Sequence, residues 1–447
     1  MLDMHSIRWG FKPLLNQVKL PADVTDFEGN QLSKLNSKSG RNHAKARLIQ
    51  FIMTSRLATF PFVGIKVAIL EEGAIYMTTT KGLEGVVATQ SAISSIIDDT
   101  LTYVGYDIDD LAVNASFEEV VYLLWHQRLP KEDELAELKK QLAANMAVPK
   151  EVLESFKTYP INDVHPMAAL RTAVSLLGLY DENAEDMSEE ANYGKAIKLQ
   201  AKMATLVTAF GRIRKGLEPV APKEELGYAA NFMYMLTGEE PKEIAVEAFN
   251  KALVLHADHE LNASTFTARV CVATLSDMYS GVTAAIGALK GPLHGGANEQ
   301  VMKMLMEIGS EENVESYIRE KLDNKVKIMG FGHRVYRKGD PRAKHLREMS
   351  KRLTELRGEE KWYNMSTKIE EIVTGEKNLP PNVDFYSASV YHSLDIDHDL
   401  FTPIFAVSRV SGWIAHILEQ YANNRLIRPR AEYTGPGMQK YVSIENR

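Results

Sequence analysis

Four ionisable side chains occur where the helical pattern of this sequence is interrupted, and their types suit proton transfer. His259 lies in "LHADHELNAST", His294 in "GPLHGGANE" and His333 in "GFGHRVYRKGDPRA". Asp384 follows the double proline in "PPNVDFYSA". Histidine titrates near neutral pH, and a carboxylate in an apolar setting becomes a stronger base. These residues are therefore candidates for acid–base catalysis.

The first segment carries two histidines, His256 and His259, which share a helix face with Glu260. This spacing is compatible with a metal, but the segment lacks the HExxH arrangement of zinc hydrolases. Two interpretations remain. The segment is either a polar helix end satisfied by backbone and water, or it carries an anion-binding histidine.

The second segment places His294 between Gly291-Pro292 and Gly295-Gly296. Proline ends the preceding helix, and the paired glycines let the backbone pass close to a ligand. A new helix is expected from Ala297. The histidine is either an ordinary turn residue or a side chain held in place for function.

The third segment concentrates positive charge around His333. Two glycines precede it, and four cations follow it within the segment: Arg334, Arg337, Lys338 and Arg342. No Gly-Lys-Ser/Thr follows, so this is not a phosphate-binding P-loop. A solvated charged face is one interpretation. The other is an anion site, since arginine suits bidentate binding of carboxylate or phosphate.

Asp384 has a plain structural alternative, because an aspartate after prolines often caps a helix. Further cations follow near the C-terminus, as surface charges or as anion ligands: Arg409, Arg425, Arg428 and Arg430.

The whole chain is acidic, with a net charge of −7 over 447 residues. Such a surface does not attract nucleic acid or anionic lipid, so an anion site must be local. Cys271 is the only cysteine, which excludes an intrachain disulfide and fits a reducing compartment. We therefore expect a cytoplasmic protein.

Residues 1–76 differ in charge from the rest, with ten basic against six acidic side chains. The apolar stretch 48–70 contains Arg56 and Lys66, each costing roughly 2.5–3.5 kcal/mol near a bilayer centre, so we do not expect a membrane span. Glu71-Glu72-Gly73 can be encoded by a purine-rich run of nucleotides whose spacing from the Met77 codon is that of a bacterial ribosome-binding site. Translation would then start at Met77. Residues 1–76 are then an extension that is either untranslated or disordered. Native protein whose intact mass includes residues before Met77 would reject translation from Met77.

Helical patterns dominate from Ser116 onward, and strand-like alternation is scarce. Ser116 and Glu119 fit a capping box, and Asp133 restarts a helical pattern. Further helices are expected at 167–177, 196–213, 243–255, 265–289, 314–322 and 404–421. The sequence predicts a mainly α protein.

Taken in order, the segments resemble the citrate synthase family, including its 2-methylcitrate synthase members. The resemblance runs from "KGLEGVV" at Lys81 to "IRPRAEYTGP" near the C-terminus and includes the four segments above. It implies a two-domain helical fold, with a large domain at 77–296 and 398–447 and a small mobile domain at 297–397. It also implies a homodimer. One departure is Val104 in "YVGY", where many relatives have a basic residue.

The resemblance implies the condensation of acetyl-CoA with oxaloacetate to give citrate and CoA. Asp384 would be the base, His294 the donor to the thioester oxygen and His333 the donor to the oxaloacetate carbonyl. No metal or cofactor is expected, and CoA thioester is a substrate.

Substrate-binding residues are implied in the same way. Oxaloacetate carboxylates would be held by His259, Arg342, Arg409 and, from the second subunit, Arg428. CoA would lie against Gly330, Phe331, Gly332, Arg337 and Lys338.

Three alternatives remain at this point. A 2-methylcitrate synthase would use propionyl-CoA, which differs by one methylene and is discriminated by only about 1–3 kcal/mol. A non-catalytic nucleotide-binding protein is disfavoured by the acidic net charge. A histidine-based metallohydrolase would lose activity with a chelator, which we do not expect.

Overall fold

The computed structural model describes residues 67–69, 75–77 and 81–447, and these fall into two units. One unit holds the described residues up to Gln90 together with Arg430–Arg447, and the other is Ser91–Pro429. In the first unit, β1 (Val67–Ile69) pairs antiparallel with β2 (Ile75–Met77). The short helices η2 (Lys81–Leu83) and η6 (Ile444–Asn446) also belong to it. Most of the predicted extension 1–76, including most of the apolar stretch 48–70, lies outside the described residues.

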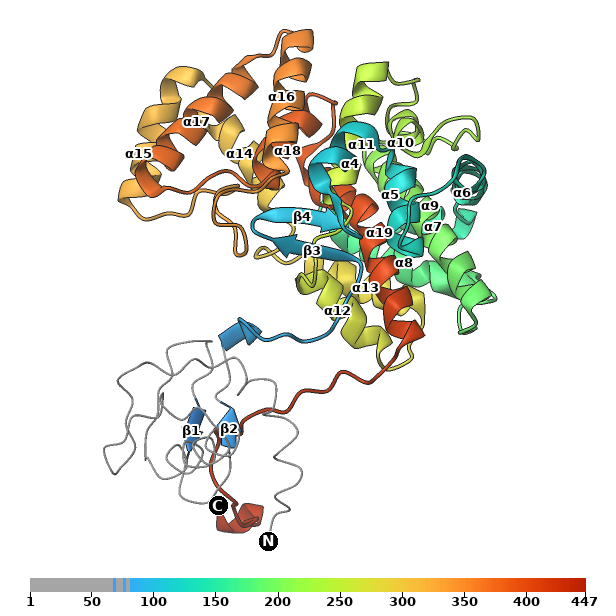
Figure 1. Ribbon diagram of the computed structural model, residues 1–447, viewed down its shortest axis with the longest axis vertical. Helices are drawn as coiled ribbons and strands as arrows, with labels where there is room; N and C mark the ends of the chain where they lie inside the picture. The colour runs from blue at the N-terminus through green and yellow to red at the C-terminus, as the bar shows by residue number, and fades with distance from the viewer. Residues whose placement is uncertain (1–66, 70–74, 78–80) are drawn as a thin grey trace, which may run out of the picture. The chain divides into compact units, whose positions relative to one another are not determined.

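The second unit is mainly α-helical, as predicted (Figure 1). Its helices, in chain order, are α4 (Ile108–Asn114), α5 (Phe117–His126), α6 (Glu132–Asn145), α7 (Lys150–Lys157), α8 (Pro166–Leu177), η3 (Gly178–Tyr180), α9 (Glu189–Arg214), α10 (Tyr228–Thr237), α11 (Glu243–His256), α12 (Ala263–Val272), α13 (Met278–Leu289), α14 (Ala297–Ile308), η4 (Glu311–Asn313), α15 (Val314–Asp323), α16 (Ala343–Arg357), α17 (Lys361–Lys377), α18 (Val383–His392), η5 (His398–Leu400) and α19 (Phe401–Ala422).

Helix starts follow local sequence signals. Ser116 and Glu119 form the predicted capping box at the start of α5. The predicted single helix 265–289 is wrong, because α12 ends at Val272 and α13 begins at Met278. Asp277 accepts a hydrogen bond from the backbone of Ser280 and so starts a new helix.

The sequence analysis missed a small antiparallel sheet. It consists of β3 (Ser94–Ile97), β4 (Thr100–Tyr103) and β5 (Tyr106–Asp107), in that order. Two-residue turns join the strands, and both residues of each turn have positive φ, at 98–99 and 104–105. The strands are too short for alternation to reveal them.

The core of this unit is built around α19, which packs against α5, α9, α11, α12 and α13. Every side chain from Phe401 to Ile417 is buried, including the polar Arg409 and His416, because other helices surround α19. By length and hydropathy, His398–Ala422 is the one candidate for a membrane span in the described part of the chain, yet its apolar window is entirely buried inside the protein.

Helices α14 to α18 pack on one another and form a separate group in Figure 1, drawn in yellow and orange. This group adjoins α11 and α19 through α14, α16 and α18. The loops at its edge carry His333 and Arg342. The predicted division into domains at 77–296, 297–397 and 398–447, and the mobility of the small domain, stay predictions.

Candidate active site

Asp384 lies in the first turn of α18 and is not its cap. Asn382 caps the helix by accepting a hydrogen bond from the backbone N–H of Asp384 over 3.1 Å. Oδ1 of Asp384 is buried and has no hydrogen-bond partner among the described residues. Burial raises the pKa of Asp384 to about 7, and nearby Arg342 opposes this shift. A carboxylate with a pKa near neutrality suits a general base.

His294 lies on the turn between α13 and α14, and its Nε2 is already occupied. The backbone N–H of Ser264, at the start of α12, donates to this nitrogen over 3.2 Å. The Ser264 hydroxyl oxygen lies 2.8 Å from the same nitrogen. Burial, helped by Arg409, lowers the pKa of His294 to about 4. The imidazole is thus neutral at pH 7, and because a backbone N–H can only donate, Nε2 accepts and the proton is on Nδ1. His294 can therefore donate a hydrogen bond from Nδ1.

His333 has the opposite tautomer for the same kind of reason. Its Nδ1 accepts hydrogen bonds from the backbone N–H groups of Val335, over 3.0 Å, and Tyr336, over 3.3 Å. Burial and the positive charge of Arg342 lower the pKa of His333 to about 4. Its proton is therefore on Nε2, which is available as a donor.

His259 lies beside His333, with a ring-centroid distance of 5.0 Å. Its Nε2 lies 2.9 Å from the hydroxyl oxygen of Tyr336. Burial, with the positive charge of Arg342, holds the pKa of His259 well below its usual value. His259, His333 and Tyr336 thus line one small region. Tyr336 was not among the predicted site residues.

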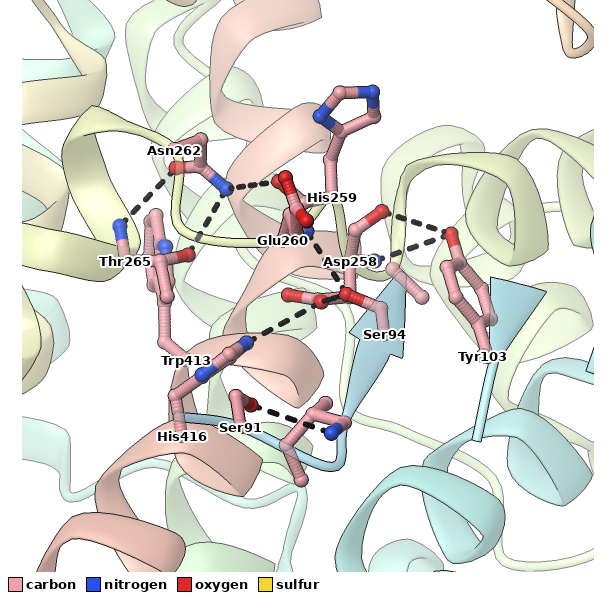
Figure 2. A network of polar contacts seen from close by, with 12 residues as sticks. Ser91, Ser94, Tyr103, Asp258, His259, Glu260, Asn262, Thr265, Trp413 and His416 are labelled. Atoms are coloured by element: carbon pink, nitrogen blue, oxygen red, sulfur yellow. Dashed lines mark hydrogen bonds and ion pairs between the residues drawn. The ribbon is translucent and has the colours of Figure 1, made fainter. Parts of the chain in front are cut away.

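A buried polar network holds the turn that carries His259 (Figure 2). Ser94 on β3 donates to the Asp258 carboxylate over 2.5 Å, and His416 on α19 lies 3.3 Å from the same oxygen. Tyr103 on β4 donates to the backbone carbonyl of Asp258 over 3.0 Å. The small sheet and α19 therefore fix the position of His259.

The two predicted anion ligands in this region are buried arginines. Arg342 is 3% exposed and Arg409 is 1% exposed. Nε of Arg409 donates to the backbone carbonyl of His256 over 2.7 Å. Burial lowers the pKa of Arg409 to about 10, so it stays charged at pH 7. Arg342 is paired with Asp340, a residue that the sequence analysis did not select.

These arginines lie at the centre of the site. The pKa of Asp384 and that of His259 are each lowered by the charges of both Arg342 and Arg409. The structure thus brings together six of the predicted residues: His259, His294, His333, Arg342, Asp384 and Arg409. Arg428 follows α19 and is exposed, and the described chain does not bring it to this group.

The predicted CoA-binding residues form the adjoining loop. Gly330 and Gly332 both have positive φ, which favours glycine. Phe331 is buried against Phe385, with ring centroids 4.5 Å apart, so its side chain is not free for a ligand. Arg337 and Lys338 are exposed, and their backbone N–H groups donate to Asp99 in the turn between β3 and β4, a site the sequence analysis missed.

No three His, Cys, Asp or Glu side chains in residues 67–69, 75–77 and 81–447 are grouped so as to hold a metal ion. The arrangement instead offers a base, two neutral imidazole donors and two buried cations. Such a set can remove a proton from carbon beside an anionic substrate.

Comparison with known proteins identifies the class of protein that carries this fold and site. The family model described as citrate synthase, C-terminal domain, matches residues 82–430. The chain therefore belongs to the citrate synthase family, whose members are acyltransferases.

Individual relatives agree with this assignment. Citrate synthase 2 of Bacillus subtilis is 76% identical over 371 residues, which are 83% of this chain and 100% of that protein. 2-Methylcitrate synthase of Mycobacterium tuberculosis is 44% identical over 357 residues, 79% of this chain and 90% of that protein. A solved citrate synthase from Thermoplasma acidophilum, described as a ternary complex with carboxymethyl coenzyme A and oxaloacetate, is 35% identical with a TM-score of 0.78, covering 82% of this chain and 99% of that one.

Proposed function

We propose that this protein is a citrate synthase. Asp384 removes a proton from the methyl group of acetyl-CoA, and the resulting carbon nucleophile attacks the ketone of oxaloacetate. Water then hydrolyses the thioester to release citrate and CoA. Thioester α-protons are weakly acidic, so the base must act with a donor that stabilises the enolate.

The two imidazoles provide the donors. His294 donates from Nδ1 to the thioester oxygen as negative charge develops there, and His333 donates from Nε2 to the oxaloacetate carbonyl. Oxaloacetate carboxylates are bound by His259, Arg342 and Arg409. The observation that carries this proposal is that backbone N–H groups occupy one nitrogen of each imidazole, which leaves the other as a donor.

The test is the release of free CoA thiol from acetyl-CoA, with and without oxaloacetate. We expect release that depends on oxaloacetate. Chelator treatment should leave the rate unchanged, because the imidazoles supply the stabilising donors. Absence of thiol release from any acyl-CoA in the presence of oxaloacetate would refute the proposal.

A 2-methylcitrate synthase is the second candidate, favoured by the 44% identical relative of that name. The 76% identical relative is named citrate synthase 2, which supports our first choice. Comparing kcat/KM for acetyl-CoA and propionyl-CoA decides between them. A large preference for propionyl-CoA would reverse the choice.

We also propose that the protein is a cytoplasmic homodimer in which Arg428 binds oxaloacetate in the partner's site. Its exposure after the end of α19 supports this. CoA would lie along the backbone of 330–332 with its phosphates near Arg337 and Lys338. Light scattering tests the dimer, and mixing Arg428→Ala with Asp384→Ala protein tests the shared site through recovered activity.

A further inference from the structure

Asp340 is a buried carboxylate in the loop before α16, and it binds Arg342 at three points. Its Oδ1 accepts from the Arg342 backbone N–H over 3.1 Å and from Nε over 2.9 Å. Its Oδ2 accepts from Nη2 over 2.8 Å. Asp340 is only 6% exposed, so these hydrogen bonds between Asp340 and Arg342 are largely shielded from water. Within the described part of the chain, the one partner of Nη1 is the Leu255 carbonyl, at 3.5 Å, so Nη1 remains available to a substrate carboxylate.

The same carboxylate also binds the start of α18. Oδ2 of Asp340 accepts a hydrogen bond from the backbone N–H of Val383 over 3.0 Å. Val383 is the first residue of α18, and the next residue is Asp384. One buried oxygen is therefore shared between the guanidinium of Arg342 and the helical turn that carries the base.

We propose that Asp340 is a positioning residue that couples the binding of oxaloacetate at Arg342 to the placement of Asp384. This inference rests on the proposed function. A shift of Arg342 toward a bound carboxylate moves the oxygen that holds Val383, and the first turn of α18 follows. Asp340 itself touches neither substrate.

The charge of Asp340 also acts on the base. Asp384 is faced by Arg342 and Asp340 from the loop before α16, by Arg409 from α19 and by Tyr391 from its own helix. Burial has the largest effect on the pKa of Asp384 and raises it. The charges of Arg342 and Arg409 lower this pKa, and the charge of Asp340 raises it. Removing the charge of Asp340 leaves Arg342 uncompensated, so the pKa of Asp384 falls.

The first test is Asp340→Asn. The asparagine amide places an NH2 group, which donates, where one carboxylate oxygen accepts hydrogen bonds in the wild type. We expect the KM for oxaloacetate to rise about tenfold or more and kcat to fall, because charge-assisted hydrogen bonds are lost. The acid limb of the kcat profile should move to lower pH. Asp340→Glu restores the charge and should return the acid limb toward that of the wild type.

Asp181→Asn is the matched control, because Asp181 is a buried carboxylate whose partners are Lys198 and Tyr279. It reports what the loss of a buried carboxylate does to folding alone. If Asp340→Asn changes KM and the pH profile no more than Asp181→Asn does, the proposal is wrong.

A second variant, Val383→Pro, removes the N–H that binds Asp340 and replaces the buried valine by an apolar side chain of similar size. Proline is tolerated at the first helical position, so α18 should still form. We expect kcat to fall about tenfold while the KM for oxaloacetate stays within about twofold, since charge-assisted binding of Arg342 is retained. An unchanged kcat in Val383→Pro would overturn the proposed coupling. This outcome decides the question even if Asp340→Asn does not fold.

Calorimetric binding of oxaloacetate separates this inference from the proposed function. Weaker binding by Asp340→Asn than by Asp181→Asn supports the role at Arg342 even without turnover, and equal binding refutes it. Failure of the wild type to release CoA would refute the proposed function instead.

Discussion

Gly412 on α19 lies directly against Asp258, the residue before His259. A Cβ added to Gly412 would lie 2.4 Å from Oδ1 of Asp258 and 2.5 Å from the carbonyl oxygen of Ala257. Both distances are too short for a carbon atom, and one of the two neighbours is backbone. The absence of a side chain at Gly412 therefore determines how closely α19 approaches the turn that carries His259.

Gly412→Ala should consequently destabilise the protein by about 1–3 kcal/mol, the usual cost of overpacking a core. The displaced turn should also raise the KM for oxaloacetate. Urea denaturation measures the first effect and initial rates measure the second. Gly194→Ala on α9 is the control, since among the described residues its added Cβ meets no atom within 4 Å beyond its chain neighbours and the backbone of its own helix, and alanine favours a helix. Equal stability changes in the two variants would contradict the prediction.

Asp384→Asn should lower kcat by about 10²–10⁴, the range expected for loss of a general base. Oxaloacetate binding should remain largely intact, because its carboxylates are bound by other side chains. Thiol release and calorimetry measure the two quantities. Unchanged turnover would refute the role of Asp384 as the base.

The pH dependence of kcat should show one acid limb near neutrality. The carboxylate of Asp384 must be ionised to accept a proton, and its pKa is raised to about 7. Activity therefore falls as the pH drops below about 7. His294 and His333, with pKa values lowered to about 4, stay neutral through this range. A limb that persists in Asp384→Glu but disappears in His333→Asn would assign the titration to the histidine instead.

Stability should depend on pH through the same carboxylate. Its pKa in the folded state, about 7, lies above the ordinary value of 3.8, so folding favours the protonated form. The ionised group thus destabilises the folded protein at pH 8, and this penalty fades as the pH falls through 7 toward 4. Asp384→Asn should be more stable than the wild type at pH 8 and equally stable at pH 4. Thermal denaturation at both pH values checks this, and a difference that grows at low pH would contradict it.

Val104→Asn should relieve about 1 kcal/mol of backbone strain in the turn between β4 and β5, since asparagine adopts positive φ at lower cost than a β-branched residue. The loss of the valine's packing against the core partly offsets this gain. Val104 has a φ of 51° and precedes Gly105. Chemical denaturation of Val104→Asn and Val104→Ala measures the effect. Alanine retains the steric cost of positive φ, so the benefit should be confined to asparagine.

Sequence patterns predicted three helices closely: α8, α11 and α15 lie within one residue of their predicted bounds. The helix predicted at 196–213 is α9, which begins earlier, at Glu189, where Ser188 caps it. The break after Val272 was missed because the apolar pattern continues across it. The strands β3 and β4 were missed because they are only four residues long.

The site residues could be predicted because they lie in sequence motifs that occur in a fixed order. Their hydrogen-bond partners became visible only in the structure. Asp340 lies two residues before Arg342, and a Gly-Asp-Pro turn beside an arginine was the available signal. Its contact with Val383 joins positions 43 residues apart, which no local pattern reveals. Ser264 and Tyr336 were likewise missed, because their hydrogen bonds to His294 and His259 join segments far apart in the sequence.

The path of the main chain determines which ring nitrogen of His294 and of His333 carries the proton. Ser264, Val335 and Tyr336 contribute peptide groups, which every amino acid except proline carries. Replacing the side chain of Val335 therefore leaves the tautomer of His333 in place as long as the loop keeps its course, whereas the Ser264 hydroxyl also lies 2.8 Å from Nε2 of His294. A proline at position 264 would remove the backbone donor to His294, whereas His333 would keep one of its two backbone donors after a single proline at 335 or 336.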